Sequence, residues 1–207
     1  MDPSPQLIEL AQHAARLVVE EGLDYASARR KALQAGAGGA VGRGMPALRE
    51  HLSHELIEDE VRAHIAIFHA DSQPAELRIL RECACRWMHR LAEFRPHLGG
   101  AVWRGTATRL SGIRIDLFCD DPKAPEIALI NLGVDYELAS APEGDGRHAI
   151  VYTFAERSAA LQDWITLHLS LLDHDDLRGA LKPDARGRTW RGDLRALERC
   201  LQETDSR

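Results

Sequence analysis

The chain of 207 residues lacks a long apolar segment, and no apolar run approaches the roughly 20 residues that a membrane-spanning helix needs. The residues from Met1 to Pro5 also lack the basic and apolar regions of a secretory signal peptide. A basic excess is missing as well: 26 Lys and Arg are outnumbered by 32 Asp and Glu, a net charge of −6. Proteins that coat nucleic acid need a basic face. We therefore expect a cytoplasmic protein that binds no membrane and does not coat nucleic acid, with a tRNA partner left open.

Cysteine is also scarce, and its spacing argues against metal or redox chemistry. The four cysteines, at positions 83, 85, 119 and 200, form no Cys-x-x-Cys pair. Cys83 and Cys85 are two residues apart on a predicted helix, so their side chains point to different faces. His51 and His54 belong to no His-Glu-x-x-His motif that would complete a zinc site. We expect four reduced thiols, no disulfide, no metal ligand and no resident cofactor.

The first half of the chain has helical periodicity. Apolar residues recur there every three to four positions, a spacing typical of amphipathic helices. The Gly-rich segment 36–44 lacks the preceding strand and the Gly-Lys-Ser/Thr ending of a phosphate loop, so we interpret it as a linker. The predicted helices of this half cover residues 6–21, 25–34, 46–69 and 75–94.

The periodicity changes near Gly99, where apolar and polar residues begin to alternate as they do in β-strands. Residues 143–146, Glu-Gly-Asp-Gly, have the composition of a hairpin turn. The expected fold class is α+β: an N-terminal helical region, 1–96, then a small mixed-sheet α/β domain, 97–207, either separate or forming one compact unit. The predicted strands are 101–104, 113–119, 134–138, 149–154 and 164–172, and the predicted helices of this half are 122–132 and 194–202.

The stretch from Gly99 to Phe118 carries the most informative motif. Gly99 and Gly100 open a turn, the element Arg104-Gly105-Thr106-Ala107 follows, and Ser111 precedes a predicted strand. This order resembles the signature of the polymerase-β-like nucleotidyltransferases, in which a Gly-Gly or Gly-Ser turn and an Arg-Gly-x-Ala element precede Ser-Asp-x-Asp on a strand. The resemblance implies a nucleotidyltransferase-like domain with ligand contacts from Gly99, Gly100, Arg104, Thr106 and Ser111.

The motif departs from the family where the family binds its metal ions. Counted from Arg104-Gly105, the two metal-binding carboxylates of the family fall on Gly112 and Arg114. Glycine offers no ligand, and arginine brings a permanent positive charge to the place where Mg²⁺ would bind. Nucleotidyl transfer needs carboxylates that hold these ions. The sequence therefore predicts a degenerate active site that keeps only Asp116 as a displaced carboxylate.

Strand alternation places three polar residues where they can form one face of the sheet. In the predicted strand 113–119, Arg114 and Asp116 lie opposite the apolar residues. In the predicted strand 164–172, His168 lies opposite the leucines, where the order of the family places its third carboxylate. If the strands are neighbours, these residues form a face that suits phosphate, because Arg and protonated His bind phosphate well. Asp116 and His168 are the candidate catalytic residues, and Arg114 is a candidate ligand contact; an ion-paired or solvated sheet face is the plain alternative.

A basic stretch near the C-terminus is a second candidate for binding a polyanion such as a nucleoside triphosphate or tRNA. Nearby acidic residues offset part of its charge, and a solvated surface is again the alternative. The stretch contains Arg178, Lys182, Arg186, Arg188, Arg191, Arg195 and Arg199, with Trp190 among them.

Three functions are consistent with these observations. The first is a nucleotidyltransferase-like protein with a degenerate site, which binds a nucleotide or another phosphorylated ligand without efficient transfer. The second is an active nucleotidyltransferase that uses Mg²⁺ and relocated ligands, Asp116 with Asp120 or His168. The third is an interaction module whose charged helices, within residues 46–94, contact a protein partner.

Overall fold

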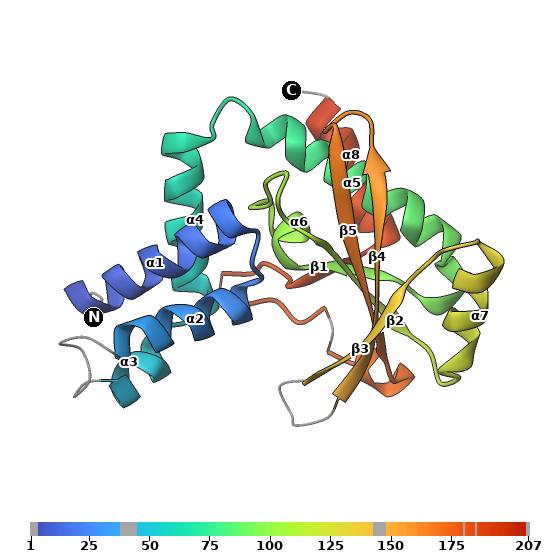
Figure 1. Ribbon diagram of the computed structural model, residues 1–207, viewed down its shortest axis with the longest axis horizontal. Coiled ribbons are helices and arrows are strands. Elements are labelled where there is room, and N and C mark those ends of the chain that lie inside the picture. Colours follow the sequence, from blue (N-terminus) through green and yellow to red (C-terminus); the bar gives the residue numbers. More distant parts are fainter. Residues whose placement is uncertain (1–3, 38–44, 143–147, 180, 185, 206–207) are drawn as a thin grey trace. The chain divides into compact units, whose positions relative to one another are not determined.

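The computed structural model describes residues 4–37, 45–142, 148–179, 181–184 and 186–205 (Figure 1). The chain divides into a helical unit, Met1–Pro74 with Thr106–Ser111, and a sheet unit, Ala75–Gly105 with Gly112–Arg207. This division differs from the expected one at residue 96, because the long helix before residue 96 groups with the sheet. The two units together have the expected α+β class, with helices first and a mixed sheet after them.

The described part of the helical unit contains the helices α1 (Pro5–Glu21), α2 (Tyr25–Ala37), α3 (Met45–His51) and α4 (His54–Phe68). The hydroxyl of Ser4 caps α1 by accepting a hydrogen bond from the Leu7 N–H at 3.3 Å. Gly22 ends α1 with a φ of 69°, and a Cβ on this residue would overlap the carbonyl oxygen of Leu110. Both the backbone conformation and the close approach therefore require glycine at position 22.

The single helix expected over residues 46–69 is instead two helices. The Ser53 hydroxyl accepts a hydrogen bond from the Leu56 N–H at 3.2 Å and so caps α4. A serine that bonds to the backbone in this way favours a helix start over a helix interior. Helix α2 continues through Gly36 to Ala37, so the expected linker begins later than predicted, and its other residues, 38–44, lie outside the described part of the chain.

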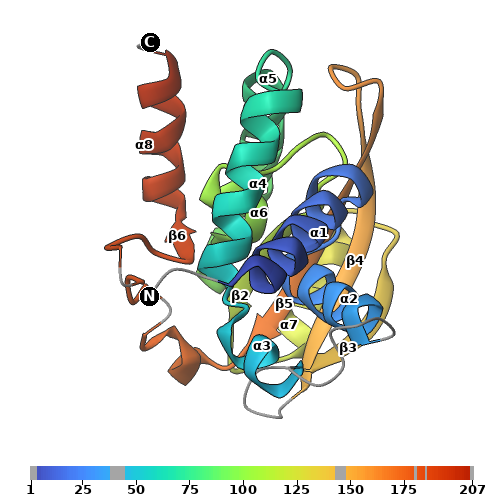
Figure 2. The same ribbon diagram turned by 90° about the vertical axis from the view of Figure 1, so that its left-hand side faces the viewer.

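Helix α1 packs against α2 and α4 (Figure 2). The short segment Thr106–Ser111 belongs to the same core, although it comes much later in the sequence. The hydroxyl of Thr108 donates to the carbonyl of Val19 at 3.3 Å, and the side-chain amide of Gln73 donates to the carbonyl of Ala107 at 2.9 Å. These buried bonds anchor the segment to the helices.

The described residues of the sheet unit form one six-stranded sheet in the order β3-β4-β5-β2-β1-β6. Strands β2 and β5 pair in parallel, and the other neighbours pair antiparallel. The long strands are those that alternation predicts best. The bounds are β1 (His97–Gly99), β2 (Ile113–Phe118), β3 (Glu137–Pro142), β4 (His148–Ser158), β5 (Asp163–Leu172) and β6 (Arg191–Asp193).

Helices α5 (Gln73–Arg90) and α7 (Lys123–Asn131) cover one face of the sheet. On that face the ring centroids of Trp87 and Phe154 lie 4.6 Å apart, and the Tyr152 hydroxyl donates to the Pro122 carbonyl at 3.2 Å. Indole and phenol rings bury a large apolar area, so these contacts fix both helices on the sheet. The other helical segments of this unit are α6 (Gly100–Arg104), α8 (Leu194–Asp205) and the single 3-10 turns Ala92–Phe94 and His174–Leu177.

The predicted strand 101–104 is wrong, because these residues form α6. Gly100 at the start of α6 and Gly105 just after its end adopt φ values of 65° and 77°, which an extended strand does not contain. The strand predicted over 134–138 begins later, at Glu137, because the Val134 N–H bonds back to the Leu129 carbonyl at the end of α7. The expected turn 143–146 lies outside the described residues.

The four cysteines are free thiols, as expected. Among the described residues, no helix is long and apolar enough to cross a membrane.

Candidate functional site

The two central strands bring Arg114 and His168 together. Strands β2 and β5 are hydrogen-bonded neighbours, with Arg114 opposite His168 and Asp116 opposite Ser170. The prediction that these strands are neighbours is therefore confirmed. The alternation is confirmed too: the isoleucines and leucines of both strands are buried, whereas Arg114 is exposed and Asp116 and His168 are half-buried. We call the side of the sheet that carries Arg114, Asp116 and His168 the polar face.

The ring of His168 is held between a threonine and a glycine. Its Nδ1 shares a hydrogen bond of 3.1 Å with the hydroxyl of Thr153 on β4. Its Nε2 and Cδ2 lie 3.1 Å from the point where a Cβ on Gly112 would be. Residue 112 is the position at which the family pattern has its first metal-binding carboxylate. The imidazole therefore takes the space that a side chain at this position would need.

The glycines of the turn lie beside Arg114. Gly99 is the register partner of Arg114 on β1, and Gly100 adopts a φ of 65°. A Cβ on Gly100 would lie 3.4 Å from the Cδ of Arg114, so the aliphatic stem of the arginine passes close over this turn. The structure thus places Gly99 and Gly100 beside Arg114, which in turn lies opposite His168.

Asp116 forms an ion pair with Arg191, which reaches it from β6. The carboxylate is mostly covered, with 15% of its side chain exposed. Asp120 follows the end of β2, and its carboxylate accepts a hydrogen bond from the backbone N–H of His174 at 3.4 Å. A metal ion at Asp116 would have to compete with the guanidinium of Arg191. This competition disfavours an active site in which Asp116, with Asp120 or His168, binds the metal.

Arg104 does not point to the polar face but is buried in a separate cluster. Its guanidinium forms an ion pair with Asp184 at 3.0 Å, donates to the Thr189 carbonyl at 3.1 Å and stacks over Trp190 at 4.2 Å. The side chains of Arg104 and Asp184 are only 2% and 1% exposed. A hydrogen bond from the backbone N–H of Arg188 is the main cause that lowers the pKa of Asp184, with Arg104 adding to it and burial opposing both. Arg104 therefore holds Asp184, Thr189 and Trp190 together.

Thr106 and Ser111 belong to the helical unit, not to the sheet unit that carries Arg114. Both are buried. The hydroxyl of Thr106 bonds to that of Tyr25 at 2.6 Å, and the hydroxyl of Ser111 accepts from the Thr108 N–H at 3.1 Å. These bonds give both residues a role in the core of the helical unit, and their predicted ligand contacts stay predictions.

The basic stretch near the C-terminus is divided by its contacts. Arg191 pairs with Asp116, and the guanidinium of Arg188 lies 3.7 Å from Asp184. Trp190 stacks under Arg104, which lies outside the stretch in sequence. Part of the predicted polyanion surface thus serves internal packing. The exposed members are Arg178, Lys182, Arg186, Arg195 and Arg199.

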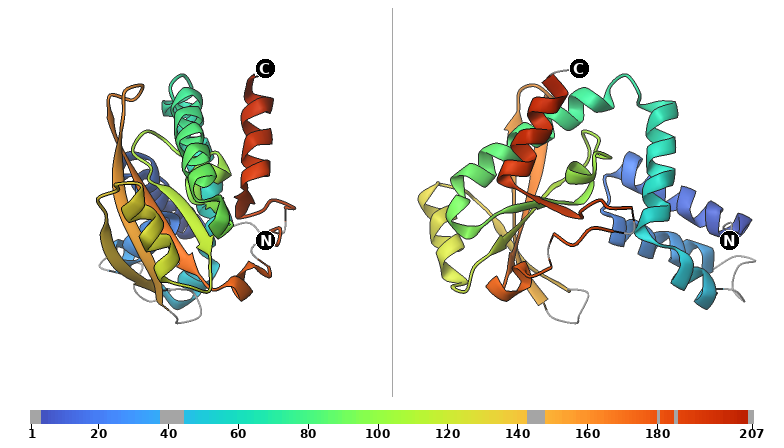
Figure 3. Two further views of the ribbon diagram at one scale, coloured as in Figure 1. Left: turned by 90° about the vertical axis from the view of Figure 1, so that its right-hand side faces the viewer. Right: turned by 180° about the vertical axis from the view of Figure 1, so that it is seen from behind.

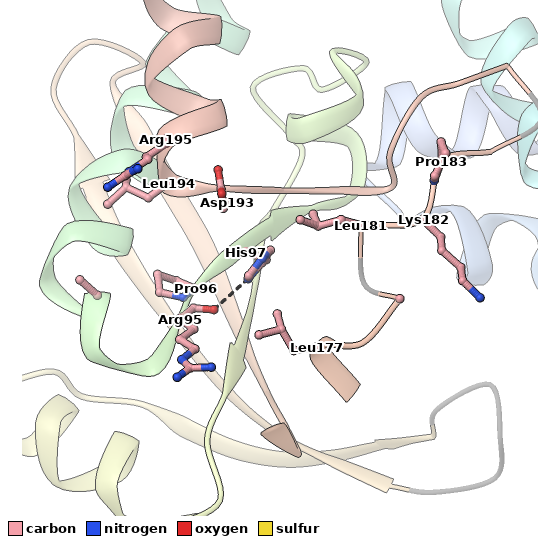
Figure 4. Close-up of a pocket in the computed structure, with 12 residues that line it drawn as sticks. Arg95, Pro96, His97, Leu177, Leu181, Lys182, Pro183, Asp193, Leu194 and Arg195 are labelled. Carbon is pink, nitrogen blue, oxygen red and sulfur yellow. Dashed lines mark hydrogen bonds between the residues drawn. The ribbon is translucent and has the colours of Figure 1, made fainter. Parts of the chain in front are cut away.

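A pocket of about 950 Å³ lies at β1 and β6 (Figure 4). Figure 4 shows the side chains of His97, Leu177 and Leu181 gathered around it, with Lys182 extending away from them. His97 is the register partner of both Asp116 and Asp193, so the pocket adjoins the polar face. The Nδ1–H of His97 donates to the Arg95 carbonyl at 2.8 Å, since a carbonyl can only accept. The sequence prediction missed His97 and Asp193, because strands of three residues are too short to show alternation.

In comparisons with known proteins, no family model, no curated protein and no solved structure matches the chain. The resemblance to nucleotidyltransferases consequently depends on the motif residues alone. The function has to be inferred from the side chains of the polar face.

Proposed function

We propose that the polar face binds the phosphate of a nucleotide or another phosphorylated ligand without metal-dependent transfer. The observation that carries this proposal is the pairing of Arg114 with His168 across β2 and β5, with the imidazole against Gly112. Neighbouring strands are about 4.8 Å apart, so a guanidinium and an imidazole at opposed positions can reach one phosphate group. Arginine presents several donors in a fixed plane that matches phosphate oxygens.

The charge beside His168 favours an anion over a cation. Arg191 and Asp116 offset each other in their ion pair. Asp193, the register partner of His97, lies one row farther along the sheet. The positive charge of Arg114 is therefore the one that neighbours His168. A catalytic Mg²⁺ pair needs an excess of carboxylates. The positions that supply them in the family are Gly112 and Arg114 here. Binding without transfer follows from this substitution.

The pocket at β1 and β6 has room for the organic part of such a ligand. His97 lies one strand over and two residues along from Arg114, a Cα separation of about 8 Å by ordinary strand spacing. Apolar side chains with a few polar groups among them are typical of sites that hold a base or ring. Leu177, Leu181 and His97 form such a lining. A nucleotide with its phosphate at Arg114 and its base in this pocket fits the proposal.

Thermal unfolding with nucleoside triphosphates, with Mg²⁺ and with a chelator, tests the proposal. We expect stabilisation that persists in the chelator, because ligand binding to the folded state raises its stability. Arg114→Gln should abolish the stabilisation, and Arg157→Gln is the matched control, since Arg157 is an exposed arginine at the other end of the sheet on β4. The unmodified protein should transfer no nucleotide.

Two results would contradict the proposal. Stabilisation that requires Mg²⁺, with transfer that Asp116→Asn abolishes, would favour the active enzyme with relocated ligands. Absence of any stabilisation would favour the interaction module. That third function has one structural observation behind it: Ile67 and Phe68, at the end of α4, are 72% and 67% exposed.

A further inference from the structure

Three potential metal ligands meet on the sheet unit, away from the polar face. Cys85 and His89 are four residues apart on α5 and therefore lie on the same side of this helix. Glu198 comes from α8, which lies over α5 in the right-hand view of Figure 3. The Cys85 Sγ, a ring nitrogen of His89 and a carboxylate oxygen of Glu198 all lie within 4.8 Å of one another. The His89 Nε2 and the Glu198 Oε1 are 3.0 Å apart.

We propose that Cys85, His89 and Glu198 bind a zinc-like divalent cation, with water completing the coordination. Zinc takes sulfur at about 2.3 Å and nitrogen or oxygen at about 2.0 to 2.2 Å, so tetrahedral ligand atoms are about 3.3 to 3.6 Å apart. The separation of His89 Nε2 and Glu198 Oε1 is slightly shorter than these values, and the two separations from Cys85 Sγ are at most 4.8 Å, so small side-chain rotations are enough to reach them. The proposal is independent of the phosphate site.

The chemistry of the three ligands selects the class of metal. A thiolate and an imidazole favour zinc and neighbouring transition metals, whereas Mg²⁺ and Ca²⁺ prefer oxygen ligands only. The side chains of His89 and Glu198 are 57% and 40% exposed, so solvent can reach the ion and supply the fourth ligand. A bound ion would join α5 to α8, and we expect it to stabilise the folded sheet unit.

The site escaped the sequence prediction for a physical reason. Cys85 and His89 alone give two ligands, which is too few to indicate a metal site. The third ligand comes from a helix more than a hundred residues later, and only the fold brings it near. Cys83, two residues before Cys85, is buried elsewhere and takes no part in the group.

Titration of the full-length, chelator-treated protein with Co²⁺ tests the proposal, because a cobalt–thiolate bond gives a charge-transfer absorption band. We expect one Co²⁺ per chain, with this band, and its displacement by Zn²⁺. Cys85→Ser should remove the band, while Cys83→Ser, the matched control, should retain it. Glu198→Gln and His89→Gln should keep the thiolate but weaken affinity by more than the roughly tenfold to hundredfold that is lost with a residue that only supports a metal ligand.

Circular dichroism of each variant checks that it is folded. Because the side chains of His89 and Glu198 are partly exposed, we expect their variants to fold like the unmodified protein. A protein that binds no stoichiometric Co²⁺ would overturn the proposal. A charge-transfer band that survives in Cys85→Ser would do the same, because the metal would then lie at another thiol. If the unmodified protein and Glu198→Gln bound Co²⁺ with equal affinity, Glu198 would not be a ligand and α8 would not contribute to the site.

Discussion

The imidazole of His168 lies against Gly112, at the point where a side chain on residue 112 would begin. Residue 112, where the nucleotidyltransferase signature that the motif resembles has a carboxylate, therefore has a neighbour that fills the space of a side chain. A carboxylate cannot be introduced at position 112 without moving this ring, which also bonds to Thr153. The absence of a side chain at position 112 and the position of His168 are thus linked through packing.

We predict that Gly112→Asp destabilises the sheet unit by about 1 to 3 kcal/mol, the usual cost of forcing a side chain into filled space. The double variant Gly112→Asp with His168→Ala should recover most of this loss, because it removes the ring that the new side chain meets. Urea unfolding of the unmodified protein, both single variants and the double variant measures this coupling. Additive effects would show that the ring does not limit position 112.

Arg114→Asp should create or strengthen divalent-cation binding at the polar face. The change removes one positive charge and adds one negative charge beside Asp116, which lessens the repulsion of a cation. Calorimetry with Mg²⁺ and Mn²⁺ measures the binding, and Arg157→Asp makes the same charge change at an exposed position on β4. Equal binding by the two variants would mean that net charge alone, and not the site, attracts the ion.

Gly192→Ala should destabilise the protein by about 3 kcal/mol, because a Cβ on this residue would overlap the ring of Trp103. The ring cannot easily move, since its Nε1–H donates to the Thr189 carbonyl at 3.0 Å. Gly187→Ala is the control: its φ is 75° but no atom lies within 4 Å of an added Cβ, so it should cost only about 1 kcal/mol of backbone strain. Chemical unfolding of both variants should show this difference, and equal losses would contradict the packing argument.

The sequence predicted the long elements of the fold because their patterns span many residues. Six residues of β2 and ten of β5 alternate clearly, and the positions of Arg114 and His168 follow from that alternation. The three-residue strands β1 and β6 show no such pattern. For α6, the apolar residues from Ala101 to Trp103 suggest a strand, and only the positive φ values of the flanking glycines decide for a helical turn.

The sequence could predict only those contacts of the site that depend on a single strand pairing. Arg114 lies next to His168 because β2 pairs with β5, and the order of the motif elements suggested this pairing. The ion pair of Asp116 with Arg191 depends on two successive pairings, β2 with β1 and β1 with β6, and no local pattern indicates the second. The burial of Arg104 likewise depends on contacts with Asp184 and Thr189, which lie 80 and 85 residues later in the sequence and which no local pattern indicates.

Cys83 should resist alkylation in the folded protein. Burial, with a smaller contribution from Glu156, raises the pKa of its thiol to about 11. Only about one thiol in a thousand is then ionised at pH 8, and the thiolate is the reactive form. We expect labelling by iodoacetamide roughly two orders of magnitude slower in the folded than in the unfolded protein, measured by peptide mass spectrometry. The Cys85→Ser variant makes the assignment unambiguous, and rapid labelling of Cys83 in it would show that this part of α5 opens readily.

The stability provided by Asp184 should disappear at acidic pH. Its hydrogen bonds from the Arg188 backbone and from Arg104 hold the pKa of the folded carboxyl below the ordinary 3.8. A folded pKa below the unfolded one means that the ionised group stabilises the fold above pH 3.8 and that this contribution is lost as the pH falls through the folded pKa.

Asp184→Asn removes the charge at every pH, so it should be clearly less stable than the unmodified protein at pH 7. The difference should shrink as the pH falls below 3.8 and through the folded pKa, where the unmodified carboxyl also becomes neutral. Unfolding curves of the two proteins across this range measure the difference, and Asp135→Asn, at an exposed position between α7 and β3, supplies a reference in which pairing with Arg104 is untouched. A constant difference between the unmodified protein and Asp184→Asn from pH 7 through the folded pKa would show that the carboxylate charge is not what anchors Arg104.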